Sequence, residues 1–257
     1  MDTKLIAGVV AAGGALLAAG GVYRMNKKCG YFKKGNHVQY DVSRIPFKKE
    51  SLLKGKTIVF LGSSVTRGYA SHNVSFSEYI AKKDSCRCIK EAVNGTTLID
   101  NGADSYVERM RTRLDKNQKV DVFICQLSTN DATRESPLGE MSESYDLESF
   151  DVTTVCGAVE YIIAYAKSTW NCPVLFYTNP RYESEAYGKM VDALLEIQKK
   201  WNIGVIDFWN DEKINQISEE ERKLYMQDPI HPMKAGYAKW LVPAMEEKME
   251  AYLKRET

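Results

Sequence analysis

Short apolar runs alternate with longer amphipathic stretches from Lys56 to the end of the chain. Five runs have the length and composition of buried strands, and they cover residues 57–61, 89–93, 120–127, 173–178 and 204–208. The other stretches place apolar residues on one helical face, which predicts helices over residues 75–82, 106–114, 153–170, 185–201 and about 234–254. This alternation indicates right-handed βαβ units and a mostly parallel sheet that is covered on both faces.

The first part of the chain follows a different pattern. Residues 5–23 read LIAGVVAAGGALLAAGGVY and carry no charge, and Arg24, Lys27 and Lys28 follow. A helix of this length extends about 28 Å, which is enough to cross the apolar core of a bilayer. We therefore expect one N-terminal transmembrane helix. A removable signal peptide is the alternative, because Ala18-Ala19-Gly20 offers small residues for cleavage.

More basic residues follow the apolar run than precede it. The positive-inside rule then favours a single-pass, membrane-anchored protein that faces the cytoplasm, whereas a secreted or extracytoplasmic protein needs the opposite orientation. Residues 25–54 are basic and show little periodicity. The predicted organisation is an anchor or signal peptide over residues 1–24, a basic tether over 25–54 and one folded domain over 55–257.

The composition is ordinary for a globular protein, with 44% hydrophobic and 27% charged residues. The 35 Lys and Arg residues nearly balance 34 Asp and Glu residues, for a net charge of +1. No basic excess points to nucleic acid, and a small or neutral partner is favoured, with no obligate protein partner indicated. Six cysteines permit disulfides without requiring them.

Four polar segments lie where chemistry is expected in such a sheet, after predicted strands or before the last helix. Gly62-Ser63-Ser64 follows the first strand, and backbone N–H groups in its turn can face a developing oxyanion. Gly95 follows the second strand and lets its N–H approach a ligand closely. Asn130 follows the third strand and can aim its side-chain amide at the same oxyanion.

The fourth segment, Asp228-Pro229-Ile230-His231-Pro232, precedes the last helix. Asp228 and His231 are three residues apart, so the carboxylate can fix the imidazole tautomer and stabilise the imidazolium. The other two histidines, His37 and His72, have no carboxylate at a suitable spacing. Each segment alone is more often a helix cap or a turn, but the order of all four is much more specific.

In this order the segments resemble the SGNH/GDSL hydrolases, whose four sequence blocks are centred on Ser, Gly, Asn and His. Ser64, Gly95, Asn130 and His231 stand at these positions, with Asp228 before the histidine, and the resemblance spans about residues 56–250. It implies an α/β fold: a flavodoxin-like three-layer α/β/α sandwich with a five-stranded parallel sheet. It also implies hydrolysis of an ester or thioester through an acyl-serine intermediate, without a metal or another cofactor.

The resemblance also implies a role for each matching residue. Ser64 is the nucleophile, His231 the general base and then the general acid, and Asp228 its orienting partner. The backbone N–H groups of Ser64 and Gly95 and the side chain of Asn130 form the oxyanion hole.

The chain departs from the family pattern at two positions. The usual Gly-Asp-Ser reads Gly62-Ser63-Ser64, and the usual glycine before Thr-Asn-Asp is Ser128. The first departure leaves Ser63 as an alternative reactive hydroxyl, although alignment through Thr66 and Gly68 favours Ser64.

The substrate is less defined. Arg181 follows the fourth strand at the rim that faces the site, where it could hold a carboxylate or phosphate or be a solvated loop arginine. Residues 209–227 are long enough to form a mobile lid. The expected substrate is a small-molecule, lipid or glycan ester, and lipid-acyl and carbohydrate O-acetyl esters are both open. The alternatives are an acyltransferase with the same residues and a non-enzymatic, membrane-anchored binding protein on a hydrolase scaffold.

Overall fold

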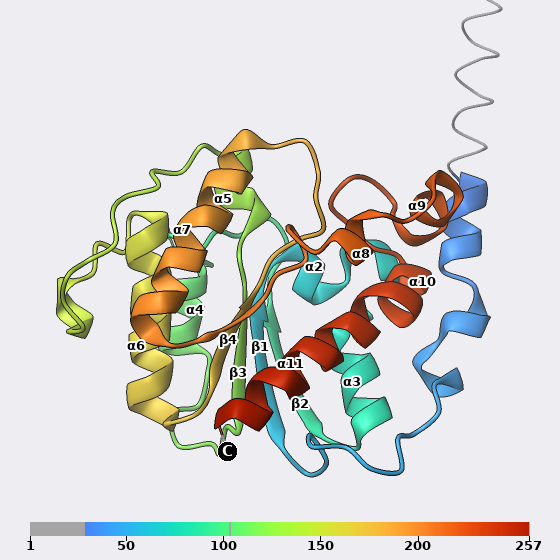
Figure 1. The fold of residues 1–257 in the computed structure, drawn as a ribbon, viewed down its shortest axis with the longest axis horizontal. Helices are drawn as coiled ribbons and strands as arrows, with labels where there is room; N and C mark the ends of the chain where they lie inside the picture. The colour runs from blue at the N-terminus through green and yellow to red at the C-terminus, as the bar shows by residue number, and fades with distance from the viewer. Residues whose placement is uncertain (1–28, 103, 257) are drawn as a thin grey trace, which may run out of the picture.

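The computed structural model describes residues 29–102 and 104–256, and its centre is a five-stranded parallel sheet (Figure 1). The strands are β1 (Thr57–Gly62), β2 (Arg87–Ala92), β3 (Val122–Gln126), β4 (Val174–Tyr177) and β5 (Gly204–Ile206). They lie in the order β2-β1-β3-β4-β5, which is the flavodoxin-like order with its topological switch at β1 and β3. The predicted three-layer α/β/α sandwich with five parallel strands is confirmed.

Alternate residues of β1 point into two separate cores. Val59 and Leu61 pack with one set of helices, while Ile58 and Phe60 pack with the other. The first face is covered by α4 (Tyr106–Thr112), α6 (Val155–Trp170) and α7 (Glu185–Trp201), and the second by α3 (Phe76–Asp84) and α11 (Val242–Glu256) (Figure 1). Because both faces are buried, the inner strands β1, β3 and β4 read as nearly continuous apolar runs, whereas the edge strand β2 contains Arg87, Lys90 and Glu91.

Short helices connect these elements. They are α2 (Ser64–Arg67), α5 (Thr129–Thr133), α8 (Glu212–Asn215), α9 (Glu219–Tyr225), α10 (Lys234–Gly236), the 3-10 turns η1 (Val38–Tyr40), η2 (Val42–Arg44), η3 (Tyr69–Ser71) and η4 (Leu147–Ser149), and the π-helical turn η5 (Tyr237–Leu241). The predicted last helix is therefore a succession of α10, η5 and α11. The segment expected as a lid, residues 209–227, contains α8 and α9.

The described part of the predicted tether lies against the domain. Residues 29–35 are helical, and the Tyr79 hydroxyl on α3 donates a hydrogen bond to the Tyr40 carbonyl at 2.6 Å. Lys48 forms ion pairs with Asp84 on α3 and Glu250 on α11. These contacts hold the segment along the α3–α11 face of the sandwich.

The structure corrects the expected membrane anchor. No helix within residues 29–102 and 104–256 is long and apolar enough to cross a bilayer. This finding contradicts the transmembrane helix in the expected fold class and, with it, the single-pass, cytoplasm-facing membrane localisation. The apolar run over residues 5–23, from which the anchor was predicted, lies outside the described residues.

Candidate active site

Ser64, His231 and Asp228 meet at the carboxyl end of the sheet. Ser64 begins α2 directly after β1, whereas Asp228 and His231 lie on the loop that leads into α10. Ser64 Oγ is 2.8 Å from His231 Nε2, and His231 Nδ1 is 2.8 Å from Asp228 Oδ2 and 3.0 Å from Oδ1. The fold thus joins three groups from distant parts of the chain into one continuous hydrogen-bonded series.

Asp228 orders the histidine loop as well as the imidazole. Its Oδ1 accepts hydrogen bonds from the backbone N–H groups of Ile230 and His231, both at 2.9 Å. Burial raises the pKa of the Asp228 carboxyl, but the hydrogen bonds from the His231 ring and from these N–H groups outweigh burial and hold the pKa below its ordinary value. The carboxylate is therefore ionised near neutral pH, which suits a group that fixes a histidine tautomer.

Buried partners fix the turn that carries Ser64. Gln126 Oε1 on β3 accepts hydrogen bonds from the Ser63 N–H, the Thr66 N–H and the Thr66 hydroxyl at 3.0, 3.2 and 2.8 Å. A Cβ at Gly62 would lie 1.8 Å from Thr66 Oγ1, so the tight packing of this turn requires glycine. As a result, only 6% of Ser64, the predicted nucleophile, is exposed.

The two adjacent serines have different surroundings. Ser64 Oγ faces His231, whereas Ser63 is completely buried and its Oγ accepts a hydrogen bond from Asn130 Nδ2 at 3.1 Å. Ser63 occupies the usual aspartate position of the motif, and here it contacts Asn130 rather than the histidine.

Gly95 and Asn130 lie close together beside this turn. Asn130 Nδ2 also donates to the Thr96 carbonyl at 2.8 Å, and Arg134 at the end of α5 donates to the Gly95 carbonyl at 2.7 Å. Gly95 has a φ of +75°, and a Cβ there would meet nothing within 4 Å. The fold therefore brings both predicted oxyanion-hole residues to the nucleophile turn and leaves open space in front of Gly95.

Arg109 contacts the turn that precedes Ser64 from the protein interior. This residue was not predicted from the sequence. It is completely buried on α4, and its guanidinium donates to the Gly62 carbonyl at 2.8 Å and to Thr96 Oγ1 at 3.2 Å. It also donates to the Glu91 carbonyl at 3.0 Å and the Glu91 carboxylate at 3.1 Å. Arg109 thus links the end of β1 to the Gly95 loop. The available signal was an arginine among the apolar positions of the predicted helix.

Two other neighbours of the histidine loop were also missed. The Tyr69 ring on η3 lies 5.1 Å from the His231 ring, centroid to centroid, and is 59% exposed. Asn36 donates to the Ala70 carbonyl at 3.0 Å and accepts from the Lys234 N–H at 3.2 Å. Asn36 therefore joins the turn that bears Tyr69 to the start of α10, just after His231.

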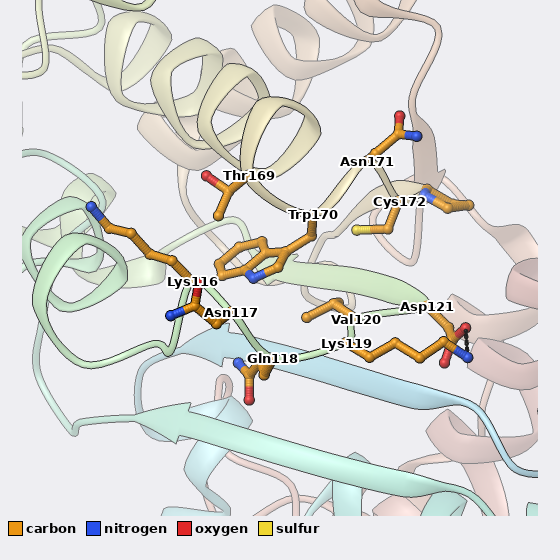
Figure 2. Close-up of a pocket in the computed structure, with 11 residues that line it drawn as sticks. Lys116, Asn117, Gln118, Lys119, Val120, Asp121, Thr169, Trp170, Asn171 and Cys172 are labelled. Carbon is orange, nitrogen blue, oxygen red and sulfur yellow. Dashed lines mark ion pairs between the residues drawn. The ribbon is translucent and has the colours of Figure 1, made fainter.

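Arg181 is exposed on the connection between β4 and α7 and does not join the triad. Its guanidinium lies against Trp209 and near Asn210, and it lines a cavity of about 410 Å³ whose wall includes Asp228. Another cavity, of about 520 Å³, lies at the opposite end of the sheet, where the chain enters β3 and β4 near Trp170 (Figure 2). None of the predicted site residues lines that second cavity. In the described part of the chain, no three His, Cys, Asp or Glu side chains converge as metal ligands.

Comparison with known proteins gives one family match and several similar solved structures. Residues 60–239 match the GDSL-like Lipase/Acylhydrolase family. Similar solved structures include a protein from Lactobacillus plantarum, which is 18% identical with a TM-score of 0.64 over 79% of this chain and 99% of that chain. A carbohydrate acetylesterase from Sinorhizobium meliloti is 15% identical with a TM-score of 0.54, over 76% of this chain and 99% of that one. A family two carbohydrate esterase from Clostridium thermocellum, in complex with cellohexaose, has the same identity and TM-score, over 81% and 66% of the two chains.

At these identities the solved structures show a shared fold. No curated protein matches the chain. The family match, by contrast, covers most of the sequence and includes every segment that carries the clustered polar residues. The chain therefore belongs to the GDSL-like lipase/acylhydrolase family and is an ester-hydrolysing enzyme.

Proposed function

We propose that this enzyme cleaves a carboxylic ester through an acyl-serine intermediate, with Ser64 as nucleophile, His231 as base and Asp228 as its orienting partner. The observation that carries the proposal is the series of contacts from Ser64 Oγ to His231 Nε2 and from His231 Nδ1 to Asp228, each at 2.8 Å. A serine hydroxyl is a poor nucleophile unless a base takes its proton as it attacks, and Nε2 is within reach of that proton.

In the proposed acylation step, Ser64 Oγ attacks the ester carbonyl carbon while His231 Nε2 takes the hydroxyl proton. The tetrahedral intermediate collapses when His231 returns this proton to the leaving alcohol oxygen, which leaves an acyl group on Ser64. Water then attacks the acyl-serine with His231 again as base, and the products are a carboxylic acid and free Ser64. Asp228 stays ionised throughout and stabilises the imidazolium.

The oxyanion is proposed to bind the N–H groups of Ser64 and Gly95 and the amide of Asn130. Both hydrogens of Asn130 Nδ2 are engaged in the free enzyme, by Ser63 Oγ and by the Thr96 carbonyl. The oxyanion of the tetrahedral intermediate, which forms next to Ser64, would accept or share the Asn130 Nδ2 hydrogen that is donated to Ser63 Oγ. Loss of one such donor typically lowers turnover by about 10²–10³.

For the substrate we propose a carbohydrate or similarly polar alcohol that carries a short acyl group. Two proteins with this fold are described as carbohydrate esterases. The exposed ring of Tyr69 beside His231 offers an apolar face on which a sugar ring can pack. Comparing acetylated oligosaccharides with long-chain p-nitrophenyl esters separates this substrate class from lipid esters.

The decisive test is covalent labelling of the full chain with a fluorophosphonate probe, paired with hydrolysis of p-nitrophenyl acetate. Ser64→Ala is expected to abolish both labelling and hydrolysis, because it removes the hydroxyl that is hydrogen-bonded to His231 Nε2. Ser63→Ala is the matched control and is expected to keep labelling, with reduced turnover because Asn130 loses a partner. Labelling that persists in Ser64→Ala but disappears in Ser63→Ala would overturn the assignment.

A further inference from the structure

Two asparagines of the chain are followed directly by glycine, in Asn94-Gly95 and Asn101-Gly102. The side-chain amide of an asparagine can be attacked by the backbone nitrogen of the next residue. Glycine hinders this attack least, because it has no Cβ and adopts many backbone conformations. The first pair follows β2 directly, and Gly95 is one of the residues proposed to bind the oxyanion. Asn94-Gly95 therefore combines a chemically labile sequence with a place in the proposed active site.

No hydrogen bond holds the peptide group between Asn94 and Gly95. Among the described residues, no group accepts a hydrogen bond from the Gly95 N–H, and none donates one to the Asn94 carbonyl. The peptide groups on either side are held, because Thr96 Oγ1 donates to the Val93 carbonyl at 2.8 Å and Arg134 donates to the Gly95 carbonyl at 2.7 Å. Gly95 has a φ of +75°, and glycine adopts either sign of φ, so the unheld peptide can rotate between its anchored neighbours.

The Asn94 side chain is also unrestrained. It is exposed, and its carboxamide forms no hydrogen bond with any other group in the described part of the chain. A Cβ on Gly95 would meet nothing within 4 Å, so open space adjoins the nitrogen that would attack. By contrast, the side-chain oxygen of Asn101 accepts a hydrogen bond from the Thr97 hydroxyl at 2.9 Å. The Asn94 carboxamide can therefore turn toward the next backbone nitrogen, whereas the Asn101 carboxamide is restrained.

We propose that Asn94 is a site of spontaneous deamidation, and that its succinimide and isoaspartate products inactivate the enzyme. The Gly95 nitrogen attacks the side-chain carbonyl carbon of Asn94 and forms a new N–C bond. The proton of that nitrogen passes through solvent to the amide group, which leaves as ammonia. In the resulting succinimide the Gly95 nitrogen carries no hydrogen, so it has nothing to donate to an oxyanion.

Water then opens the succinimide ring at one of its two carbonyl carbons. Cleavage between the Gly95 nitrogen and the main-chain carbonyl of residue 94 gives isoaspartate, in which the backbone runs through the former side chain and is longer. Cleavage between the same nitrogen and the side-chain carbonyl gives aspartate with an ordinary backbone. Isoaspartate therefore displaces the Gly95 N–H, whereas aspartate restores it and adds a carboxylate beside it.

The loss of activity rests on the proposed function, in which the Gly95 N–H binds the oxyanion that forms next to Ser64. Removal of one oxyanion donor, or its displacement by about 1 Å, typically lowers turnover by about 10² or more. Deamidation at Asn101 removes none of the proposed oxyanion donors. The two Asn-Gly pairs are therefore expected to differ in their effect on catalysis, which makes each a control for the other.

The test stores the full chain at mildly alkaline pH, which accelerates deamidation, and follows both its p-nitrophenyl acetate hydrolysis and its peptide masses. One tryptic peptide, Glu91–Arg109, carries both sites, so fragmentation of this peptide assigns each change in mass to residue 94 or 101. We expect the activity of the wild-type chain to fall in step with the summed succinimide and isoaspartate fractions at residue 94. A molecule modified in either way is expected to have a kcat about 10²-fold lower.

Asn94→Gln and Asn101→Gln are the matched variants. Each keeps a side-chain amide, but a glutamine must close a six-membered ring and reacts much more slowly. Asn94→Gln is expected to begin with the kcat of the wild-type chain and to retain it during storage. Asn101→Gln is expected to lose activity as the wild-type chain does. Asn94→Asp supplies the activity of the aspartate product, for which the time course is corrected.

The outcomes separate this inference from the proposed function. An unchanged mass at residue 94, or equal loss of activity in Asn94→Gln and the wild-type chain, would overturn the inference and leave the esterase intact. Succinimide and isoaspartate at residue 94 with undiminished kcat would overturn it as well. If the fresh chain neither hydrolyses the ester nor is labelled at Ser64 by the fluorophosphonate, the proposed function fails, whereas the masses at residue 94 still test the deamidation.

Discussion

Two buried charge clusters in this molecule differ in how their polar groups are satisfied. Arg109, beneath the active site, is completely buried, and its guanidinium donates to carbonyls and side chains at the ends of β1 and β2 and on the Gly95 loop. Asp84 and Glu246, between α3 and α11, are 1% and 3% exposed. Each of these two carboxyls keeps one oxygen, Asp84 Oδ2 and Glu246 Oε1, that accepts no hydrogen bond from an N–H or hydroxyl group among the described residues.

A shared proton explains the second cluster. Burial and the neighbouring Asp84 raise the pKa of Glu246 to about 7. Burial also raises the pKa of Asp84, but hydrogen bonds from Glu246, Ser51 and Lys48 outweigh it and hold that pKa below its ordinary value. The Arg109 cluster differs, because its guanidinium hydrogens go to backbone carbonyls, the Thr96 hydroxyl and the Glu91 carboxylate. The titratable cluster lies instead where Lys48 attaches the outer segment of the chain.

The largest expected effect comes from the proposed triad, which neither cluster includes. Asp228→Asn is expected to lower kcat by about 10³–10⁴, because the amide stabilises the wrong tautomer of His231. The free energy of unfolding should change little, since the Asp228 side chain is 40% exposed. Steady-state kinetics with p-nitrophenyl acetate measures the first quantity and urea denaturation the second. Asp192→Asn, on the exposed face of α7, is the control, and wild-type turnover in Asp228→Asn would exclude the proposed triad.

A substitution of Arg109 tests whether the cluster beneath the active site serves catalysis. Arg109→Lys keeps the charge but has fewer donors, so Gly62 and Thr96 are no longer held together. We expect kcat to fall about tenfold with KM nearly unchanged, because the oxyanion donors shift by a fraction of an ångström. The rate of fluorophosphonate labelling should fall in parallel. Arg111→Lys, a partly exposed neighbour, is the control, and a loss of stability with unchanged kcat would reduce Arg109 to a structural role.

The sequence predicted the parts of the fold that repeat a simple pattern. All five strands and the long helices were located, because the inner strands form nearly continuous apolar runs and long helices repeat their apolar positions. The edge strand β2 carries charged residues, and its predicted range, 89–93, is shifted from the observed Arg87–Ala92. The short helices α2, α5, α8 and α9 were missed, since so few residues carry no periodic signal. The transmembrane anchor was wrong, and its segment is rich in Gly and Ala and therefore only moderately hydrophobic.

The sequence predicted only those site residues that stand in short, recognisable polar segments. The order of the Ser64, Gly95, Asn130 and His231 blocks indicated a hydrolase, and membership of the family excludes the non-enzymatic alternative. Arg109 was missed because its acceptors are distant in sequence; the Gly62 carbonyl is 47 residues away. The packing of strands and helices decides which oxygens accept hydrogen bonds from a buried guanidinium. A single sequence does not reveal this packing.

The titratable cluster is expected to make stability depend on pH. The folded chain keeps a proton on Glu246 up to about pH 7, whereas the unfolded chain releases it near 4.5. The stabilisation is therefore complete below about pH 4.5 and is lost as the pH rises through 7. We expect the free energy of unfolding to fall by about 2 kcal/mol between pH 5 and 7.5 from this group. Glu246→Gln, whose amide can donate to Asp84 at any pH, should flatten this slope.

Chemical denaturation at several pH values gives this slope directly. Glu247→Gln is the matched control, since it lies on the same helix but is exposed. It should leave the slope of the wild-type chain unchanged. A slope that persists in Glu246→Gln would assign the pH dependence to another group, and the contrast between the two buried clusters would then be wrong.

The smallest expected effect concerns Lys48, which contacts Asp84 at 3.1 Å, Glu246 at 3.4 Å and Glu250 at 3.0 Å. Lys48→Met keeps the apolar stem but removes the cation that compensates these carboxylates. We expect a loss of about 1 kcal/mol at pH 8, and a smaller loss at pH 5.5, where protonated Glu246 needs less compensation. Lys49→Met, its exposed neighbour, should have no such effect. kcat should be unchanged in both variants, because this cluster holds the outer segment and not the catalytic loops; a drop in kcat for Lys48→Met alone would show that the two clusters are coupled.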